Sequence, residues 1–504
     1  MWWVVYLSLL GTLAVWAPPR LFDPLDPRFL VILGVVGTWR YGWGAVHLIR
    51  AHLYRRVVFP RLRRRAEAAF AALTAPDDGD EGRSARLPHV FLVITGYRYE
   101  AAVTAACWRA AVLEAMRYGG PVTLVASLVE PADRRLVKDV FRVLAPPARV
   151  RLVLVELPPE GKREALAAAL VAVARRAPRA DDVVALMDGD TLLTPRCLRR
   201  TVPLLSLAPR PGGVTTDERP LVRGSRLVRA WFALRFAQRH LYMCSLALSR
   251  RLLVMTGRFS LYPAHVATDP AFIDRIRRDE IEHWRLGRIR LLTGEDKSTW
   301  LHLLEHGLDM LYVPDVTVLT AEALPERRFL AGATRLMRRW FGNMLRGSVR
   351  ALALGPRRVG AFAWWCLVDQ RLSMWTPVLG PLAAIAIAVA VDPLFLYAYL
   401  LWVLTTRLVL VLGLTTLRPG LDGLAPLLLY FNQVYGALVK QWVLFRLDDQ
   451  RWTRQPIARA GRSGAGARLS TWLAHGTAVL ALLVAVGFLT GLLELPPASA
   501  VVLP

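Results

Sequence analysis

Cysteine is scarce in this sequence, and its placement excludes two kinds of framework. The 504 residues include four cysteines, which are dispersed and form no CxxC pair, and the central histidines show no metal-ligand spacing with a matching partner. Neither a zinc site nor a disulfide-bonded scaffold is therefore indicated, and we expect buried, reduced thiols. The cysteines are Cys107, Cys197, Cys244 and Cys366.

Acidic residues are also few relative to basic ones. Lysine and arginine number 65 against 39 aspartates and glutamates, which gives a formal net charge of +26. Nucleic acid would suit such an excess, but no helix-turn-helix, zinc-ligand or RNA-binding pattern accompanies it. Most of the surplus arginines lie beside apolar segments, as the cytoplasmic flanks of membrane helices do. We therefore expect anionic lipid headgroups and a phosphate-rich substrate as partners, and no nucleic acid.

Hydrophobic residues, in contrast, make up 54% of the chain and are grouped in long runs that predict membrane helices. The first two runs, residues 2–17 and 29–49, predict a helical hairpin. No positively charged region precedes the first run and no small-residue cleavage site follows it, so we expect an anchor and not a signal peptide. The dense arginines that begin at Arg50 place that end of the hairpin, and hence the N-terminus, in the cytoplasm.

The C-terminal third is again apolar. Arginines follow residues 424–445 and should be cytoplasmic, whereas two earlier crossings already return the chain to the cytoplasm, so we expect this run to be interfacial or re-entrant. About five spans and an external C-terminus result from this count. Residues 326–353 and 359–375 mix arginines and aromatics with leucines, which indicates amphipathic helices on the membrane surface. The three predicted C-terminal spans are residues 375–391, 394–415 and 472–493.

Between these runs the sequence has the pattern of an α/β domain. Short apolar runs rich in β-branched residues alternate with helix-like stretches, which predicts a mostly parallel sheet with a ligand crevice at the carboxyl ends of its strands. Asp188 directly follows the fourth run, so we expect it to project into that crevice. The four predicted strands are residues 90–95, 122–127, 151–156 and 183–187.

Two acidic clusters are suited to chemistry on a phosphorylated substrate. Asp188 and Asp190 flank one glycine, a spacing that lets both carboxylates reach one hard cation, or lets one hold the cation and the other a sugar. Downstream, Asp296 at an expected helix start is our candidate general base, and Glu295 would orient it or contact an acceptor. Taken separately, the first cluster is more typical of a solvated turn than of a metal site, and the second could be an ordinary helix N-terminus.

Cationic and aromatic groups accompany these acids. Arg338 and Arg339 can neutralise a leaving diphosphate, and the indole of Trp340 can stack on a sugar face. Lys162 stands at the start of a predicted helix, where phosphate binds readily. The alternative readings are an interfacial basic helix for the first group and a solvated surface charge for the lysine.

In order and type, these elements resemble the motifs of the processive membrane glycosyltransferases of family 2, which make cellulose, chitin, hyaluronan and mannuronan. Those enzymes carry a strand-end DxD, a TED or GDD motif with the base, and QxxRW on an amphipathic helix. The resemblance covers residues 88–345 and, in arrangement, the flanking membrane segments. It is nearest to mannuronan synthase in residues 125–130, 214–218, 293–298 and 339–346. The matching motifs are Asp188-Gly189-Asp190, Gly294-Glu295-Asp296 and Leu336-Met337-Arg338-Arg339-Trp340.

Three positions depart from the family pattern. Leu336 replaces the glutamine of QxxRW, which puts any contact of that glutamine in doubt. Glu295 makes the second motif a hybrid of the two family forms. The acid that usually ends the second strand has no clear match, and Glu130 is its candidate substitute.

The resemblance implies a GT-A fold and inverting hexosyl transfer. Asp188 and Asp190 would hold Mg²⁺ or Mn²⁺ on the donor diphosphate, and Asp296, with Glu295 beside it, would deprotonate the acceptor. Nucleotide binding is implied for Thr95, Tyr97, Glu100, Glu130, Lys162, Asp188 and Arg339, acceptor binding for Thr256, Gly257, Arg258, Asp296 and Trp340, and diphosphate binding for Arg338 and Arg339.

By the same resemblance, the chain is expected to be a multi-pass inner-membrane synthase with a cytoplasmic catalytic domain, which adds sugar from a nucleotide sugar, GDP-mannuronate by its motifs, to a polysaccharide and moves the polymer across the membrane. Cyclic di-GMP-binding regulatory or export subunits are implied partners. The alternatives are a UDP-sugar-dependent hyaluronan- or cellulose-like synthase, a non-processive lipid-carrier glycosyltransferase, and a transporter. The expected domains are a transmembrane hairpin (1–50), a basic segment and linker (51–88), the GT-A domain (89–325), interface helices (326–375) and a C-terminal transmembrane region (376–504).

Overall fold

The computed structural model of the chain describes residues 2–17, 36–74, 87–158, 160–451, 458–459 and 464–494. The loop of the predicted hairpin and part of the predicted linker lie outside these residues. The chain forms two compact units, which we call the helical unit and the α/β unit. The helical unit comprises Met1–Leu48, Val368–Arg446 and Arg462–Pro504, and the α/β unit comprises Ile49–Leu367 and Leu447–Gly461.

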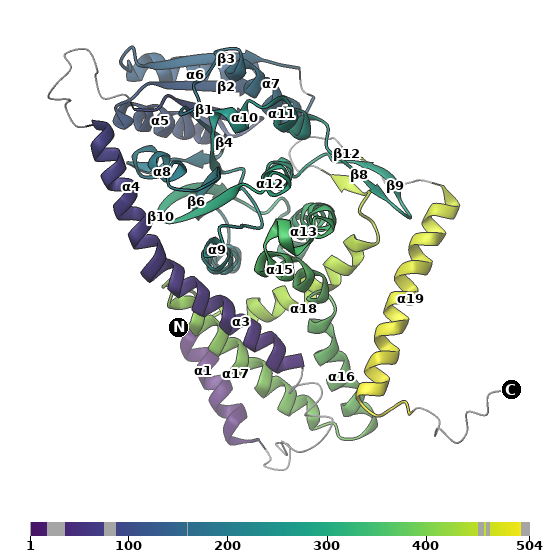
Figure 1. Ribbon diagram of the computed structural model, residues 1–504. Coiled ribbons are helices and arrows are strands. Elements are labelled where there is room, and N and C mark those ends of the chain that lie inside the picture. The colour runs from purple at the N-terminus through teal and green to yellow at the C-terminus, as the bar shows by residue number, and fades with distance from the viewer. Residues whose placement is uncertain are drawn as a thin grey trace. The chain divides into compact units, whose positions relative to one another are not determined.

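The α/β unit is built on one eight-stranded sheet with strand order β3-β2-β1-β4-β7-β6-β10-β5 (Figure 1). Strands β1 to β4 pair in parallel, whereas β7 runs antiparallel to both β4 and β6. The mixed, mostly parallel sheet and the four predicted strands are therefore confirmed. The strands are β1 (Val90–Gly96), β2 (Val122–Leu128), β3 (Val150–Glu156), β4 (Val183–Asp188), β5 (Thr191–Leu192), β6 (Pro211–Val222), β7 (Phe259–Pro263) and β10 (Asp309–Glu322).

Burial explains why these strands read as continuous apolar runs. Every residue of β2, and all but the last residue of β1 and β4, is buried, because helices cover parallel strands on both faces. Helix α7 packs on β1 and β2, and α5 packs against α6. The helices of this half of the unit are α5 (Ala101–Tyr118), α6 (Pro131–Leu144), α7 (Lys162–Ala174) and α8 (Cys197–Leu205).

The second half of the α/β unit adds helices around the long pair β6 and β10. The four cysteines are buried and form no disulfide, as expected. A small hairpin, β8 (Glu280–His283) with β9 (Gly287–Arg290), stands apart from the main sheet, as does the pair β11 (Gln450–Arg451) with β12 (Ala458–Arg459). The helices are α9 (Arg226–Ala247), α10 (Ala264–Ala267), α11 (Pro270–Arg277), α12 (Glu295–Glu305), α13 (Phe329–Ala353), α14 (Gly355–Val359) and α15 (Ala361–Leu372).

Helix continues through part of the segment that the sequence marked only as basic. After α3 (Val36–Leu53), a short π-helix (Tyr54–Val58) leads into α4 (Phe59–Thr74), which packs on α8. The guanidinium of Arg63 is buried, with its Nε 2.9 Å from Asp315 and its Nη1 donating to the carbonyl of Arg200. The density of arginines indicated only a basic segment, but α4 is a packed helix and Arg63 is buried inside the α/β unit.

The helical unit contains α1 (Trp2–Val15) and four helices from the C-terminal part. Among the described residues, three helices are long and apolar enough to cross a membrane. They are Ala361–Ala390, which takes in α15 and α16, Phe395–Thr415 and Ala465–Leu489. Large apolar side chains such as Val389 are left exposed on them, as expected of surfaces that face lipid. The helix that the charges set apart, α18, is not among the three. The helices are α16 (Thr376–Ala390), α17 (Phe395–Thr415), α18 (Ala425–Leu444) and α19 (Ala465–Leu489).

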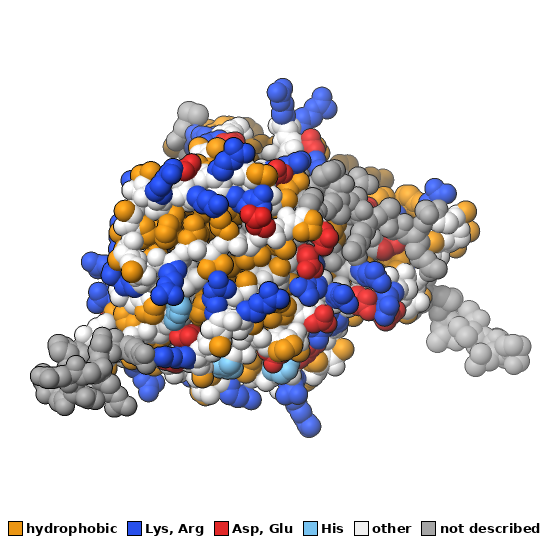
Figure 2. Space-filling model, turned by 90° about the horizontal axis from the view of Figure 1, so that it is seen from above, with side chains coloured by type: hydrophobic (Ala, Val, Ile, Leu, Met, Phe, Trp, Pro, Cys, Tyr) orange, Lys and Arg blue, Asp and Glu red, His pale blue; other side chains and the backbone are white. Residues whose placement is uncertain are grey.

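Surface charge is spread rather than gathered on the face shown in Figure 2. Lys and Arg side chains stand there among hydrophobic and acidic ones, over much of the visible surface. Inside the helical unit, two arginines have polar partners. Arg40 forms an ion pair with Asp369 at 2.7 Å, and Arg407 donates to Tyr41 and Gln433. These partners reduce the cost of placing charge among apolar helices.

Candidate active site

A cleft of about 220 Å³ in the α/β unit collects most of the predicted site residues. It lies where β1 and β4 end, against the first turns of α7 and α12 and one face of α13. All but three of the predicted residues line it, although they come from segments up to about 250 residues apart in the chain. They are Thr95, Tyr97, Lys162, Asp188, Asp190, Thr256, Gly257, Arg258, Glu295, Asp296, Arg339 and Trp340.

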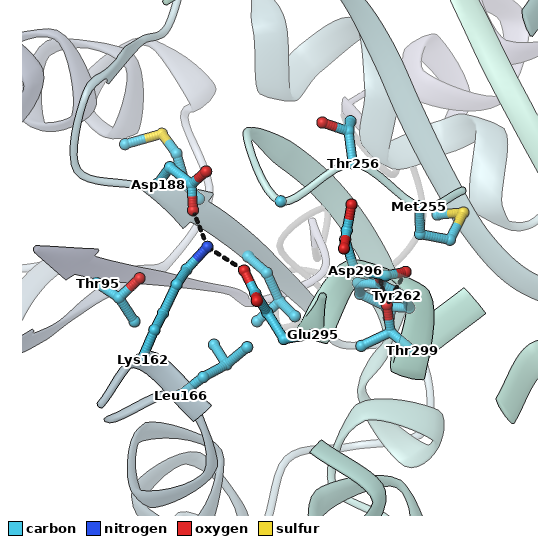
Figure 3. A pocket seen from close by; sticks show the side chains of 13 residues that line it. Thr95, Lys162, Leu166, Asp188, Met255, Thr256, Tyr262, Glu295, Asp296 and Thr299 are labelled. Carbon is cyan, nitrogen blue, oxygen red and sulfur yellow. Dashed lines mark hydrogen bonds and ion pairs between the residues drawn. The ribbon is translucent and has the colours of Figure 1, made fainter. Parts of the chain in front are cut away.

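Lysine 162 joins the two acidic motifs at one end of the cleft. Its Nζ lies 2.6 Å from Oδ1 of Asp188 and also donates to Oε1 of Glu295 (Figure 3). Burial alone would lower the pKa of Lys162, but the attraction of the two carboxylates outweighs it and raises that pKa above the ordinary value. Burial likewise opposes ionisation of Glu295, yet the lysine holds the pKa of Glu295 at about 2. Both groups are therefore charged near neutral pH.

Three local features bring these groups together. The parallel register places Thr95 opposite Asp188, so the carboxylate stands at the strand ends. Gly189 follows because the backbone passes very close to β1: a Cβ there would lie 2.8 Å from the carbonyl oxygen of Thr95. Next to Lys162, buried Arg163 donates to the carbonyl of Thr293 and the hydroxyl of Ser298. The start of α7 is thereby tied to the start of α12.

The surroundings of Asp296 shift its pKa in the direction opposite to that of its neighbour Glu295. Burial, and then the negative charge of Glu295, raise the pKa of Asp296 above the usual range. Figure 3 shows its carboxylate pointing toward Thr256, while the contacts of Lys162 run to Asp188 and Glu295. A carboxylate whose pKa is raised accepts a proton more readily, which is what a general base needs. This arrangement suits the role predicted for Asp296.

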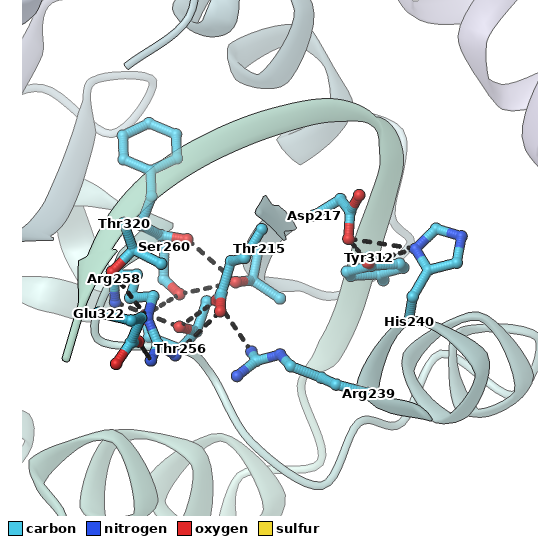
Figure 4. A network of polar contacts seen from close by, with 12 residues as sticks. Thr215, Asp217, Arg239, His240, Thr256, Arg258, Ser260, Tyr312, Thr320 and Glu322 are labelled. Carbon is cyan, nitrogen blue, oxygen red and sulfur yellow. Dashed lines mark hydrogen bonds and ion pairs between the residues drawn. The ribbon is translucent and has the colours of Figure 1, made fainter. Parts of the chain in front are cut away.

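A second set of charges lines the opposite wall. Glu218, buried in β6, accepts from the Thr256 hydroxyl at 2.6 Å and from Nη1 of Arg258 at 2.9 Å. Arg258 also bonds Glu322 at the end of β10 (Figure 4). Arg239 of α9 approaches Glu218 from the other side, at 3.1 Å. Glu322 and Arg239 line the cleft as well.

Glu218, Glu322 and Arg239 are the charged groups of the site that the sequence did not indicate. The only signal near any of them was the similarity of residues 214–218 to mannuronan synthases, which marked the segment and not the residue. An acid at a strand end and an arginine within a helix have no distinctive spacing, so a motif search passes over them.

Residues of the Arg-Trp motif lie on different sides of helix α13. Arg339 and Trp340 line the cleft, whereas Arg338 is exposed outside it and Leu336 is buried in the core. Trp340 stacks on Trp231 of α9 with ring centroids 5.9 Å apart. The leucine at the family's glutamine position is thus a packing residue, and it has no polar group to offer a ligand.

Two other predicted nucleotide contacts also stand outside the cleft. Glu100 pairs with Arg223 at 2.5 Å, and both side chains are more than 60% exposed. Glu130 pairs with Arg98 at 2.8 Å, and its neighbour Val129 lines the cleft. The roles predicted for Glu100, Glu130 and Arg338 stay predictions.

The carboxylates of the cleft suit a small divalent cation held together with a ligand. Among the described residues, no group of three or more His, Cys, Asp or Glu side chains converges on one point. Mg²⁺ and similar ions are commonly held by one or two carboxylates, with substrate phosphates and water completing the coordination. Asp188 and Asp190, both lining the cleft, fit that incomplete donor set.

Comparison with known proteins agrees with this geometry. Residues 88–343 match the model of a family described as "Glycosyltransferase like family 2". The chain is 44% identical over 453 residues to a protein from Pseudomonas syringae pv. tomato named "Glycosyltransferase alg8", with 90% of each chain covered. It is also 44% identical to the protein of the same name from Azotobacter vinelandii, which covers 90% of this chain and 89% of that one.

Among solved structures, the chain is similar to the mannosyltransferase PcManGT from Pyrobaculum calidifontis, which was determined in complex with GDP-Man and Mn²⁺. The identity is 18% and the TM-score 0.43, over 79% of this chain and 98% of that one.

Proposed function

Because the chain belongs to glycosyltransferase family 2 and is therefore a glycosyltransferase with a GT-A-like fold, we propose that it polymerises mannuronate from GDP-mannuronate, by inverting transfer to a growing polysaccharide. The observation that carries the proposal is the meeting of three distant motifs in one cleft, at 188–190, 294–296 and 339–340. The 44% identity to two alg8 glycosyltransferases over nine-tenths of the chain supports alginate synthesis as the setting.

The donor would bind at the end of the cleft that Lys162 occupies. Asp190 and Asp188 would hold the divalent ion that the family implies, Mg²⁺ or Mn²⁺, which stabilises negative charge on the leaving diphosphate. Lys162 and Arg339 line the same space, and as cations they suit the phosphates. Asp188 would then be shared between the lysine and the divalent ion.

The acceptor would bind between Trp340 and Asp296. The indole, held from behind by Trp231, offers a flat face for a sugar ring. Asp296 would take the proton of the attacking hydroxyl as the bond to the donor's anomeric carbon forms, and the nucleoside diphosphate leaves from the opposite side. Thr256 and Arg258, fixed by Glu218, would form the floor of this subsite.

Three long apolar helices indicate membrane association. We further propose an inner-membrane location with the α/β unit in the cytoplasm, passage of the polymer through the helical unit, and the domain order derived from the sequence. A partner that binds cyclic di-GMP, or one that exports the polymer, would complete such a system.

The test is nucleotide release by the purified, detergent-solubilised chain with Mn²⁺ or Mg²⁺. GDP-mannuronate, GDP-mannose, UDP-glucose, UDP-N-acetylglucosamine and UDP-glucuronate are offered separately, and products are sized on a gel. GDP release from GDP-mannuronate with long products is the expected result. Release from a UDP-sugar instead would overturn the donor assignment, and only short products at high acceptor concentration would overturn processive synthesis.

A variant of the metal site provides the matched control. Asp190→Asn keeps the size of the side chain and removes one proposed ligand charge, so release should fall and should respond weakly to added Mn²⁺. Asp274→Asn changes an exposed acid of α11 in the same unit and should behave as the wild type. Equal activity of both variants would remove Asp190 from the metal site.

A further inference from the structure

One face of α9 is turned toward the acceptor side of the cleft. Trp231, Arg235 and Arg239 are spaced four residues apart, so they share a stripe along this helix. Trp231 stacks on Trp340, and the guanidinium of Arg235 lies 4.2 Å from the centroid of the Trp340 ring. The first two residues of the stripe therefore fix the position of Trp340, whereas Arg239 reaches the cleft itself.

Arg239 has hydrogen-bonding capacity that its surroundings do not use. Its Nη2 lies 3.1 Å from Oε1 of Glu218, yet this buried nitrogen makes no hydrogen bond among the described residues. Glu218 is already satisfied, because it accepts from Thr256 and Arg258. The contact with Glu218 thus keeps Arg239 in place without occupying its planar donor edge. A quarter of the side chain, 26%, remains exposed, toward the cleft that it lines.

The neighbours of Arg239 place it close to the proposed base. Burial lowers the pKa of Lys297 to about 8, and the positive charge of Arg239 contributes to the same shift, so the two cations are near each other. Lys297 directly follows Asp296 and is fixed by donating to the carbonyl of Leu253. Arg239 and Asp296 also line the same cleft. An acceptor hydroxyl that reaches Asp296 therefore lies within the field of a guanidinium with free donors.

A uronic acid acceptor creates an electrostatic problem at this place. In a hexuronate the carboxyl group is attached to the ring carbon beside the one that bears the 4-hydroxyl. If chain growth uses that hydroxyl, a negative charge arrives next to Asp296, which already bears the repulsion of Glu295. A cation with free, geometrically fixed donors can offset the added charge, and guanidinium binds carboxylate with two parallel hydrogen bonds.

We propose that Arg239 binds the carboxylate of the terminal sugar of the acceptor and thereby selects a polyuronate over a neutral polysaccharide. The inference rests on the proposed function, since it presumes that the polymer is a uronate. Arg239 would act as a specificity residue: it holds the acceptor with its hydroxyl at Asp296, while the donor end of the cleft works without it.

The experiment compares two acceptors with one donor. Mannuronate oligosaccharides, and the same oligosaccharides with their carboxyl groups reduced to primary alcohols, are extended from GDP-mannuronate by the full-length wild type, Arg239→Gln and Arg239→Lys. We expect kcat/KM of the wild type to favour the acidic acceptor by about 10- to 100-fold, the range of a charge-assisted hydrogen-bonded pair. Arg239→Gln should lose most of this preference through a higher acceptor KM, and Arg239→Lys should retain part of it.

Two controls separate recognition from damage to the fold. Arg229→Gln alters an arginine of the same helix that is exposed and bonds only its own loop at Gly224, and should keep the wild-type preference. Arg239→Gln should still bind GDP, measured by calorimetry, which a misfolded variant would not do. An unaltered acceptor preference in Arg239→Gln overturns the inference and leaves the proposed function intact. No turnover of GDP-mannuronate by the wild type overturns both.

Discussion

The two walls of the cleft are built from the same kinds of charged side chain, but in different balance. On the donor wall, Asp188 and Glu295 share the single amine of Lys162. On the opposite wall, two arginines face two carboxylates, and Arg239 retains donors that make no hydrogen bond. The first wall has a surplus of negative charge, whereas the second has unused hydrogen-bond donors.

This difference indicates what each wall binds. A carboxylate surplus is stabilised by a further cation, which suits a divalent ion that arrives with a diphosphate. A guanidinium with free donors is stabilised by an anion, which suits a charged acceptor. The contrast also explains how one cleft can hold two negatively charged substrates: each binds against a different complement of charge.

The largest effect is expected at the carboxylate that faces the acceptor. Asp296→Asn removes the proposed base and should lower kcat by about 10²- to 10⁴-fold, the usual contribution of general base catalysis. Binding of GDP-mannuronate, measured by calorimetry, should hardly change, because Lys162 makes its contacts with Asp188 and Glu295 and not with Asp296. Glu295→Gln is the informative neighbour, since it should weaken donor binding instead. If Asp296→Asn weakened donor binding and Glu295→Gln lowered kcat, the two residues would have the opposite roles. The proposed difference between the two walls would then be wrong.

The next largest effect should follow from removing the shared cation. Lys162→Met leaves Asp188 and Glu295 without their common partner, so the two carboxylates repel each other and the donor phosphates. We expect affinity for GDP to fall about 10- to 100-fold, with partial recovery in Lys162→Arg. Lys138→Met, an exposed lysine of α6, is the matched control. Undiminished GDP affinity in Lys162→Met would mean that the phosphates bind elsewhere.

A smaller effect tests the backbone beneath the donor wall. In Gly189→Ala the new Cβ would meet the carbonyl oxygen of Thr95 at 2.8 Å, so β4 and the flanking aspartates must shift. We expect a loss of about 1–3 kcal/mol in the free energy of unfolding, as for other overpacked sites, and weaker metal-dependent nucleotide binding. Gly466→Ala in α19, where no atom lies within 4 Å of the added Cβ, serves as the control. A fully active Gly189→Ala variant would show that the aspartates need no fixed spacing.

The donor wall could be predicted from the sequence, but most of the acceptor wall could not. Strand β4 is a short buried run that ends in Asp188, so burial and strand direction together located this residue. Arg258 was recognised by family resemblance, whereas Glu218 and Arg239 belong to β6 and α9, whose positions depend on the antiparallel pairing around β7. Such pairing is set by tertiary packing and has no local signal.

Helix α13 shows a second limit of sequence reasoning. The motif predicted that both arginines serve the diphosphate, yet residues one position apart on a helix point in directions about 100° apart. Arg339 therefore lines the cleft while Arg338 is exposed. The sequence alone does not say which face of an arginine-rich helix turns inward, because the choice depends on what packs behind it.

Lys297, near both walls, gives the smallest expected effect. Burial lowers the pKa of Lys297 to about 8 from its usual 10.5, so the folded protein binds this proton less tightly than the unfolded chain does. Between these two pH values the unfolded state carries more protons, and the lysine's contribution to stability must therefore increase as pH rises. Relative to Lys297→Gln, the wild type should gain about 2–4 °C in melting temperature from pH 7.5 to pH 9.5. If melting temperature depends on pH in the same way in both proteins, Lys297 is well solvated. That result would contradict its placement beside Arg239 on the acceptor side.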